Sequence, residues 1–161
     1  MEKVVLGLGS NLGLRKRFIN KAVNEISQLE GFKVIALSPL YETGPWGLKS
    51  QRNFINCVLI GLSCLKPGEL LEKLLIIEKK LGRKKRVKWG PREIDLDILF
   101  YGRKIIKSGK PVIPHPMIQE RNFVLVPLNE IAPNMVHPVL KKKISTLLAA
   151  CKDKSKVKIY Y

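Results

Sequence analysis

The chain has 161 residues, of which 45% are hydrophobic, so we expect one soluble domain spanning residues 1–161. No apolar run is long enough to cross a membrane and no charged-then-apolar leader opens the chain, which predicts a cytoplasmic protein without a membrane partner. The formal net charge of +17 indicates anionic partners, although scattered lysines on a solvated surface explain much of it.

The first predicted element is a buried strand over Lys3–Gly9, in which valine and leucine alternate with small residues. It leads into Gly7–Gly13, which is not GxGxxG, because its third glycine falls one place late, and not a P-loop, because no Gly-Lys-Ser/Thr follows. We interpret this stretch as a tight turn in which Ser10 or Asn11 caps the next helix. That helix carries one apolar stripe and ends at Gly31.

A second strand is expected over Phe32–Ser38, and it could continue past Pro39 to Thr43. The loop that follows, Gly44–Gln51, is rich in chain-breaking residues and carries an exposed tryptophan, Trp46. Three polar, Gly- and Pro-punctuated loops, Leu12–Arg17, Gly44–Arg52 and Arg83–Arg92, suit lids that exclude water from a site.

A third strand is expected over Asn53–Leu62, with Phe54, Asn56 and Val58 on one face and Ile55 and Cys57 on the other. Asn56 is a polar side chain on an otherwise apolar face. A buried amide needs partners, so either an internal hydrogen bond or a ligand must satisfy it.

Pro67 and Gly68 open a second helix, which we expect to end near Leu81. Its inner stripe is apolar, and Glu78 borders that stripe. Burial of the Glu78 carboxylate would be costly without a cationic or hydrogen-bonding partner.

The most informative stretch joins a basic loop, Arg83–Arg92, to a strand that reaches Tyr101. Period-two alternation places Asp95 and Asp97 side by side on one face of this strand, opposite an apolar face of Ile94, Leu96, Ile98 and Phe100. Two such carboxylates repel each other, so neighbouring basic side chains or a divalent cation such as Mg²⁺ must compensate them. Carboxylates, guanidinium groups and an aromatic ring on one site suit a nucleoside triphosphate. The alternative is a salt-bridged strand beneath a solvated basic loop.

The predicted order of strand, helix, strand, strand, helix and strand is typical of a ferredoxin-like βαββαβ core in an α+β fold. The sheet would be mostly antiparallel with both helices on one face, which leaves the face of Asp95 and Asp97 for a site. C-terminal additions would partly cover that face. They are short strands around residues 105–113, a rigid Pro114-His115-Pro116 segment, an apolar strand or run over Phe123–Leu128, a helix over Lys141–Cys151 and a strand or tail over Val157–Tyr161.

The three cysteines, Cys57, Cys64 and Cys151, have apolar neighbours and no CxxC spacing. No histidine lies close to them in the sequence. We therefore expect free, buried thiols rather than a disulfide or a zinc site.

From the first strand to about Pro133, the chain resembles the 6-hydroxymethyl-7,8-dihydropterin pyrophosphokinase family of folate synthesis. The most specific segment is Lys88–Ile98, which matches the family signature RWGPR-x-x-DLDI with lysine in place of the first arginine. The other matching segments are Gly9–Gly13, Tyr41–Thr43, Phe54–Asn56, Glu78, Gly82-Arg83, Pro114–Pro116 and Glu120–Leu125.

The resemblance implies transfer of pyrophosphate from ATP to the pterin, with release of AMP. Asp95 and Asp97 would be the metal ligands for two Mg²⁺ ions, and the catalytic residues would be Arg83, Trp89, Arg92, Asp95 and Asp97. Residues implied for ATP binding are Glu78, Arg83, Lys88, Trp89, Arg92, Ile98, Lys110, His115 and Arg121. Residues implied for pterin binding are Thr43, Gly44, Pro45, Trp46, Phe54, Asn56, Asp95 and Phe123, where the two phenylalanines would sandwich the ring. We expect a monomer whose partners are these two substrates.

The chain departs from some relatives in its basic loop, which is about one residue shorter between Arg83 and Trp89. Whether Lys85 or Arg86 provides the second loop cation therefore stays open. No general base is assigned.

A nucleic-acid-binding ferredoxin-like module is the alternative from another functional class. Its sheet would stack bases on aromatic rings, and the positive charge would attract phosphates. The RNP1 pattern is absent, however, and Asp95 and Asp97 would lie where RNA phosphates need cations. We therefore favour the enzyme and expect no nucleic-acid partner.

Overall fold

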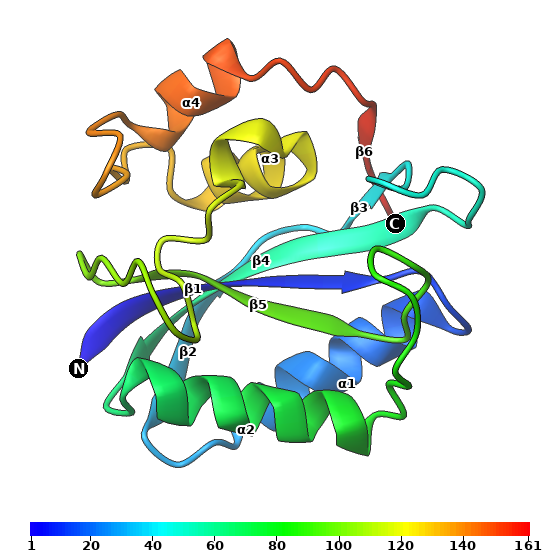
Figure 1. Ribbon diagram of the computed structural model, residues 1–161, viewed down its shortest axis with the longest axis horizontal. Helices are drawn as coiled ribbons and strands as arrows, with labels where there is room; N and C mark the ends of the chain where they lie inside the picture. Colours follow the sequence, from blue (N-terminus) through cyan, green and yellow to red (C-terminus); the bar gives the residue numbers. More distant parts are fainter.

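The computed structural model describes residues 1–161 as a six-stranded antiparallel sheet between two helical layers (Figure 1). The strands run in the order β5-β1-β4-β3-β6, and β2 also pairs with β4. Their bounds are β1 Glu2–Ser10, β2 Phe32–Leu37, β3 Tyr41–Thr43, β4 Phe54–Ser63, β5 Asp95–Tyr101 and β6 Val157–Ile159. The expected α+β fold and the order of its βαββαβ core are confirmed.

One helical layer consists of α1, Arg15–Ser27, and α2, Pro67–Lys80 (Figure 1). Their apolar stripes pack on Leu6 of β1, Ile55 of β4 and Leu96 of β5. These strand residues alternate with residues that face the other way, as a two-sided sheet requires. The expected cap at Ser10 or Asn11 is wrong, because α1 begins only at Arg15 and no side chain caps it.

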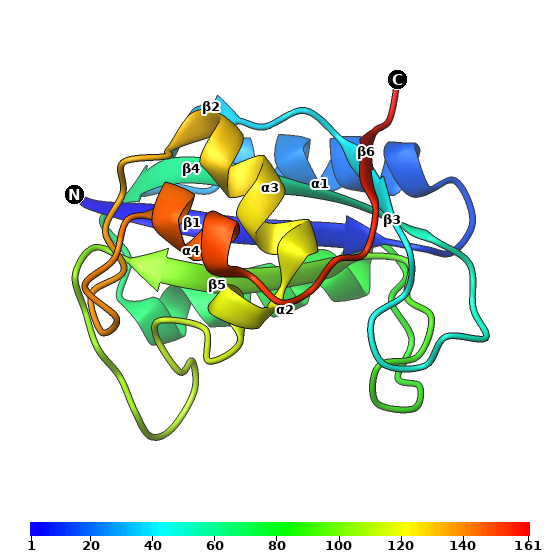
Figure 2. The ribbon, with the colours of Figure 1, turned by 90° about the horizontal axis from the view of Figure 1, so that it is seen from above.

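The second layer consists of α3, Asn122–Ile131, and α4, Ile144–Ala150, preceded by a short 3₁₀ turn, Ile118–Glu120. Figure 2 shows these helices crossing the face of the sheet that α1 and α2 leave open. The strand or run expected over Phe123–Leu128 is a helix; periodicity alone does not distinguish short apolar segments of the two kinds. None of the helices combines the length and hydrophobicity that crossing a bilayer requires.

A β-bulge interrupts the alternation in β5. Leu6 of β1 lies opposite Ile98 and Val5 lies opposite Phe100, so Leu99 has no partner across the ladder. Phe100 consequently packs against α3 and α4 rather than sharing the face of Ile98, and the expected single apolar face is wrong at that residue. Asp95 and Asp97 lie before the bulge and keep the expected face.

Smaller differences concern the ends of elements. Strand β2 stops at Leu37, and β3 is a separate strand rather than its continuation. The two strands expected around residues 105–113 reduce to one bridge between Ile106 and Ile113. The cysteines are free, as expected, but Cys64 is exposed rather than buried.

Candidate active site

The carboxylates of Asp95 and Asp97 lie at the start of β5, opposite Gly9 and Gly7 of β1. These glycines leave room above the sheet. A Cβ atom on Gly9 would lie 2.7 Å from the Asn56 Oδ1 atom, closer than real side chains approach. The paired glycines on the site face of β1 are a signal that the sequence analysis did not use.

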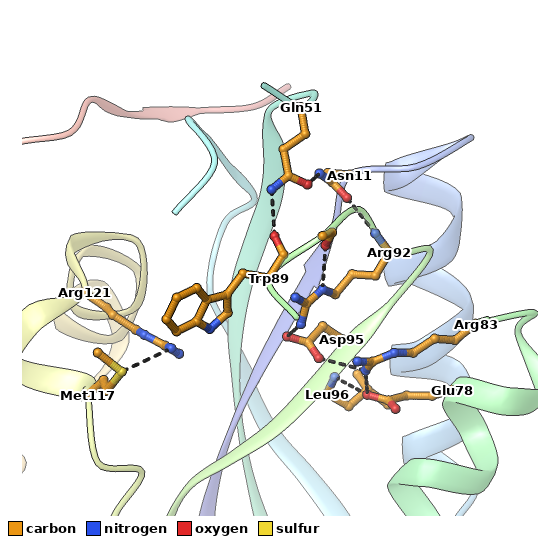
Figure 3. Close-up of polar contacts among 11 residues, drawn as sticks. Asn11, Gln51, Glu78, Arg83, Trp89, Arg92, Asp95, Leu96, Met117 and Arg121 are labelled. Carbon is orange, nitrogen blue, oxygen red and sulfur yellow. Dashed lines mark hydrogen bonds and ion pairs between the residues drawn. The ribbon is translucent and has the colours of Figure 1, made fainter. Parts of the chain in front are cut away.

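Asp95 forms ion pairs with two arginines of the basic loop (Figure 3). Its Oδ1 atom lies 2.8 Å from Arg83, and its Oδ2 atom lies 3.0 Å from Arg92. Guanidinium groups are well suited to such pairing, and they bind phosphate in the same way. The predicted compensation of Asp95 by neighbouring arginines is therefore present.

Asp97 differs from Asp95 because no cation within ion-pair distance compensates it. Burial, followed by the negative charge of Asp95, raises the pKa of Asp97 to about 7, while the charge of Arg121 acts in the opposite direction. A hard divalent cation would relieve both unfavourable effects, because carboxylate oxygens are its preferred ligands. The donor set of Asp95 and Asp97 therefore fits Mg²⁺.

Glu78 is 4% exposed and joins the end of α2 to the start of β5. Its Oε1 atom accepts hydrogen bonds from the Leu96 N–H at 2.7 Å and from Arg83 at 2.6 Å (Figure 3). Burial raises the pKa of Glu78 to about 7, against the opposing effects of these two donors. Glu78 thus has the partners that its burial required, and it orients Arg83 toward Asp95.

The turn after β1, the Gly44–Gln51 loop and the basic loop meet above the carboxylates, and Asn11 and Gln51 connect them (Figure 3). Asn11 donates to Gln51 at 2.9 Å and accepts from the Arg92 N–H at 2.8 Å. The rings of Trp46 and Trp89 meet edge to face, with their centroids 5.7 Å apart. The loops are predictable from the sequence, but these contacts are not, because the partners lie about 40 or more positions apart along the chain.

A narrow cavity of about 80 Å³ lies on one side of the carboxylates. It is lined by Thr43, Gly44, Trp46, Phe54, Asn56, Asp95 and Phe123, which are all the residues expected to bind pterin except Pro45. Asn56 donates to Thr43 Oγ1 at 2.7 Å, so the internal partner exists. The Arg121 guanidinium lies 4.9 Å from the Trp46 ring centroid and 5.7 Å from that of Phe123. A bicyclic ring needs more room than this, so its binding requires Arg121 or Trp46 to shift.

An open cleft of about 830 Å³ lies on the other side. It is lined by Glu78, Arg83, Lys88, Trp89, Arg92, Lys110, His115 and Arg121, which are all the residues expected to bind ATP except Ile98. The Ile98 side chain is buried in the core beneath the helices, so only its backbone could contact a nucleotide. The Arg121 Nε atom is buried without a hydrogen-bond acceptor, which a phosphate oxygen could supply.

The surroundings of Lys85, Arg86 and His115 decide which of them brings an unpaired positive charge to this cleft. Arg86 forms two 2.8 Å hydrogen bonds with Glu93. Of the two candidates for the second loop cation, Lys85 is therefore the one that makes no ion pair. Burial, followed by the positive charge of Arg121, lowers the pKa of His115 to about 4. His115 is therefore neutral at pH 7 in the ligand-free protein.

A wider depression of about 950 Å³ lies elsewhere, beside the start of α1. Basic side chains such as Lys16, Arg17 and Arg52 line it, and Glu25 is the one carboxylate in the lining. It lacks a carboxylate pair, and Tyr160 is the one aromatic residue in its lining. The carboxylate-centred region is thus the better candidate for a catalytic site.

The sequence model of 7,8-dihydro-6-hydroxymethylpterin-pyrophosphokinase (HPPK) matches residues 5–133 of the chain. The chain belongs to the HPPK family. The 2-amino-4-hydroxy-6-hydroxymethyldihydropteridine pyrophosphokinase of Aquifex aeolicus is 44% identical over 144 residues, which are 89% of each protein. The Bacillus subtilis enzyme of the same name is 43% identical over 78% of this chain and 75% of its own length.

Longer proteins also contain an HPPK-like region. The folic acid synthesis protein fol1 of Pneumocystis carinii is 49% identical over 90% of this chain, which spans 20% of that protein. A solved Plasmodium falciparum HPPK-DHPS chain has a TM-score of 0.70 at 18% identity, over 92% of this chain and 44% of that one. The structural match concerns the fold alone.

HPPK membership establishes the reaction class. The chain is an enzyme that transfers pyrophosphate in folate synthesis, and the nucleic-acid-binding alternative is not supported. HPPK enzymes use ATP and a pterin as substrates, generally with Mg²⁺.

Proposed function

We propose that this HPPK transfers pyrophosphate from ATP to 6-hydroxymethyl-7,8-dihydropterin at the carboxylate pair of Asp95 and Asp97. The observation that carries the proposal is the position of this pair between the aromatic cavity and the basic cleft. Both carboxylates line both spaces, as do Trp89, Arg92 and Arg121. A group that passes from a ligand in the cleft to one in the cavity would pass beside these residues.

The cleft residues would bind the triphosphate. Asp95 and Asp97 would hold two Mg²⁺ ions, which would supply the positive charge that neutralises the carboxylates and the triphosphate. Arg83 and Arg92 pair with Asp95 in the ligand-free protein, and they would turn to phosphate oxygens. His115 and Arg121 also line the cleft and would contact the same phosphates.

The cavity residues would bind the pterin. Phe54 and Phe123 would stack on its flat ring, since aromatic faces pack well on heteroaromatic plates. Asn56 and Thr43 would meet its polar edge, with their mutual hydrogen bond setting the orientation of the amide. This arrangement would leave the hydroxymethyl group directed toward the carboxylates.

The chemical step would then be an in-line displacement. The hydroxymethyl oxygen forms a bond to the β-phosphorus of ATP, the bond from that phosphorus to the α–β bridging oxygen breaks, and AMP leaves. The hydroxyl proton passes to solvent, since no side chain is assigned as a base. Such transfer depends mainly on alignment and charge neutralisation, which the cations of the cleft supply. Closure of the loops around Trp46 and Trp89 would exclude water from the β-phosphorus.

Phosphorus NMR of the reaction tests the proposal directly. With ATP, Mg²⁺ and the hydroxymethyl-dihydropterin, we expect stoichiometric AMP and a pterin diphosphate. The same mixture with excess EDTA should yield neither product. Stoichiometric ADP with a pterin monophosphate would contradict the assignment of β-phosphorus as the atom attacked.

A further inference from the structure

The last ten residues form a strap, residues 152–161, that lies outside the region matched by the HPPK family model. Figure 2 shows this strap leaving α4, passing beside the start of α3 and reaching β3. Strand β3 ends at Thr43, and α3 begins beside Phe123. The strap therefore connects the two walls of the aromatic cavity.

At its first contact, the strap binds the start of α3. The Asp153 Oδ2 atom accepts a hydrogen bond from the Asn122 N–H at 3.1 Å, and Asn122 Nδ2 donates to the Ser155 carbonyl oxygen at 3.0 Å. No neighbouring side chain caps helix α3. Asp153, which lies 31 positions later in the chain than Asn122, supplies the acceptor that an N-terminal N–H needs. Asn122 lies between Arg121 and Phe123, both of which line the cavity.

The Asp153 carboxylate is itself held in place. Its Oδ1 atom accepts hydrogen bonds from the Ser155 N–H at 3.0 Å and the Ser155 hydroxyl at 2.6 Å. Partial burial acts to raise the pKa of Asp153, but the bonds from Ser155 and Asn122 bring it below its ordinary value. The carboxylate is thus ionised and oriented at neutral pH, as a strong helix cap requires.

At its second contact, the strap pairs with β3 as strand β6. Val157 lies opposite Thr43, and Ile159 lies opposite Tyr41. Without β6, β3 would be an edge strand with one row of unpaired backbone groups, and such short edges fray. Thr43 is the residue whose hydroxyl accepts the hydrogen bond from Asn56.

The end of the strap is fastened to the sheet. The Tyr160 N–H donates to the Leu40 carbonyl oxygen at 2.8 Å, and the Arg15 guanidinium lies 5.6 Å from the Tyr160 ring centroid. Arg15 also forms a 2.8 Å ion pair with Glu42 of β3 and is 10% exposed. These contacts hold β3 and the strap against α1 as one unit.

We propose that the strap is a positioning element that sets the distance between the Thr43 and Phe123 walls and thereby the affinity for the pterin. This inference rests on the proposed function, because it requires the aromatic cavity to be the pterin site. Asp153 and Val157 act through Phe123 and Thr43 and touch no substrate. Half of the residues that line the nucleotide cleft belong to the basic loop, and no hydrogen bond or ion pair joins that loop to the strap.

The main test compares two binding constants in a chain that ends after Lys156. Calorimetry would measure the affinity for Mg²⁺ with a non-hydrolysable ATP analogue, and then for the hydroxymethyl-dihydropterin in the presence of that analogue. We expect pterin affinity to fall about five- to tenfold while nucleotide affinity stays within about twofold, the size expected for loss of local ordering contacts. A chain lacking only Tyr161, which is 95% exposed, is the matched control and should behave as the full chain. Unchanged pterin affinity, or equal loss of both affinities, would overturn the proposal.

A second pair of variants keeps the proposal testable if the shortened chain does not fold. Asp153→Ala removes the cap, whereas Asp153→Asn retains an oxygen that can accept the Asn122 N–H. We expect Asp153→Ala to weaken pterin binding about fivefold and Asp153→Asn to restore most of it. Equal effects of the two substitutions would overturn the positioning role.

Phe123→Ala, measured in parallel, separates the inference from the proposed function. If Phe123→Ala weakens pterin binding and the strap variants do not, the strap proposal is wrong and the pterin site stands. If Phe123→Ala has no effect on pterin binding, the assignment of the cavity and the strap proposal both fail.

Discussion

The side-chain amide of Gln51 donates a 2.8 Å hydrogen bond to the carbonyl oxygen of Trp89. The same amide donates to the Leu48 carbonyl oxygen at 2.7 Å, and its oxygen accepts from Asn11 at 2.9 Å. One side chain thus connects the Gly44–Gln51 loop, the basic loop and the turn after β1. Trp89 has a positive φ of 58°, which is unusual for a large residue, so its loop depends on such contacts to keep this conformation.

Gln51→Ala should loosen the Trp89 loop and lower kcat/KM about three- to tenfold, because the lost hydrogen bonds are largely exposed. Turnover assays would measure the loss. Acrylamide quenching in a Trp46→Phe background, where Trp89 is the only tryptophan left, would show greater exposure of Trp89. Gln28→Ala, at an exposed position near the end of α1, is the control and should change neither quantity. Unaltered quenching in Gln51→Ala would remove the connecting role.

Phe54→Ala should weaken pterin binding at least tenfold and leave nucleotide binding nearly intact. Phe54 lines the aromatic cavity but not the basic cleft, and stacking of a base on an aromatic ring contributes about 1–3 kcal/mol. Asn56→Ala should show the same selectivity, since Asn56 also lines only the cavity. Calorimetry with each ligand would measure both effects, and a comparable loss of ATP affinity would place these residues outside the pterin site.

Asp97→Asn should nearly abolish turnover while stabilising the protein in the absence of metal. The amide keeps the volume of the carboxylate but removes a negative charge that is buried and repelled by Asp95. We expect the free energy of unfolding in EDTA to rise by about 1 kcal/mol, together with loss of the Mg²⁺-dependent increase in melting temperature. Near-normal turnover would mean that the carboxylate pair is the salt-bridged strand considered in the sequence analysis.

Arg92→Ala should lower kcat about 10²–10³-fold and weaken Mg-ATP binding far less. Arg92 pairs with Asp95 before the nucleotide binds, so its full interaction with phosphate forms late, and an interaction that is strongest in the transition state acts on kcat. Steady-state kinetics beside direct binding measurements would separate the two effects. Arg103→Ala, at an exposed position after β5, provides the matched charge control. A loss confined to ATP affinity, with unchanged kcat, would make Arg92 a simple ground-state phosphate ligand.

His115 predicts a specific pH dependence of stability. Its pKa is about 4 in the folded protein and 6.5 in its ordinary state, so between these values the unfolded chain binds a proton that the folded chain does not. This contribution to stability is present above pH 6.5 and is lost as the pH falls toward 4. Urea unfolding at pH 7 and pH 5 should show a decrease that is smaller by roughly 1–2 kcal/mol in His115→Gln than in the unmodified chain. Equal decreases in both proteins would show that His115 titrates normally.

Periodicity predicted the elements whose two faces differ clearly. Strand β4 alternates between Asn56 and Val58 on one side and Ile55 and Cys57 on the other, as expected. Helix α2 lies within one or two residues of its expected bounds because Pro67 fixes its start. The apolar run after Phe123 has no such contrast between faces, so the sequence predicts a strand or an undefined run where the structure has helix α3.

The candidate site was predictable to the extent that its residues are neighbours in sequence or belong to the family signature. Asp95, Asp97 and Arg92 are of this kind. Asn11 and Gln51 are not, because their roles depend on loops that approach one another only after folding. The pairing of Arg86 with Glu93 likewise depends on the path of the loop, which residue types do not specify.

The β-bulge at Leu99 determines which face of the sheet the following residues of β5 occupy. The first half of β5 carries Asp95 and Asp97, and its second half carries Phe100, which packs in the core beneath α3 and α4. Because Leu99 bulges out of the ladder, Phe100 lies on the same face of the sheet as the two carboxylates. Deletion of Leu99 would make Leu6–Ile98 and Val5–Phe100 successive pairs of a regular ladder, so Asp95, Asp97 and Phe100 would keep the face they occupy now. The strand would lose only the Leu99 side chain, which lines the aromatic cavity and packs in the core beneath α3 and α4.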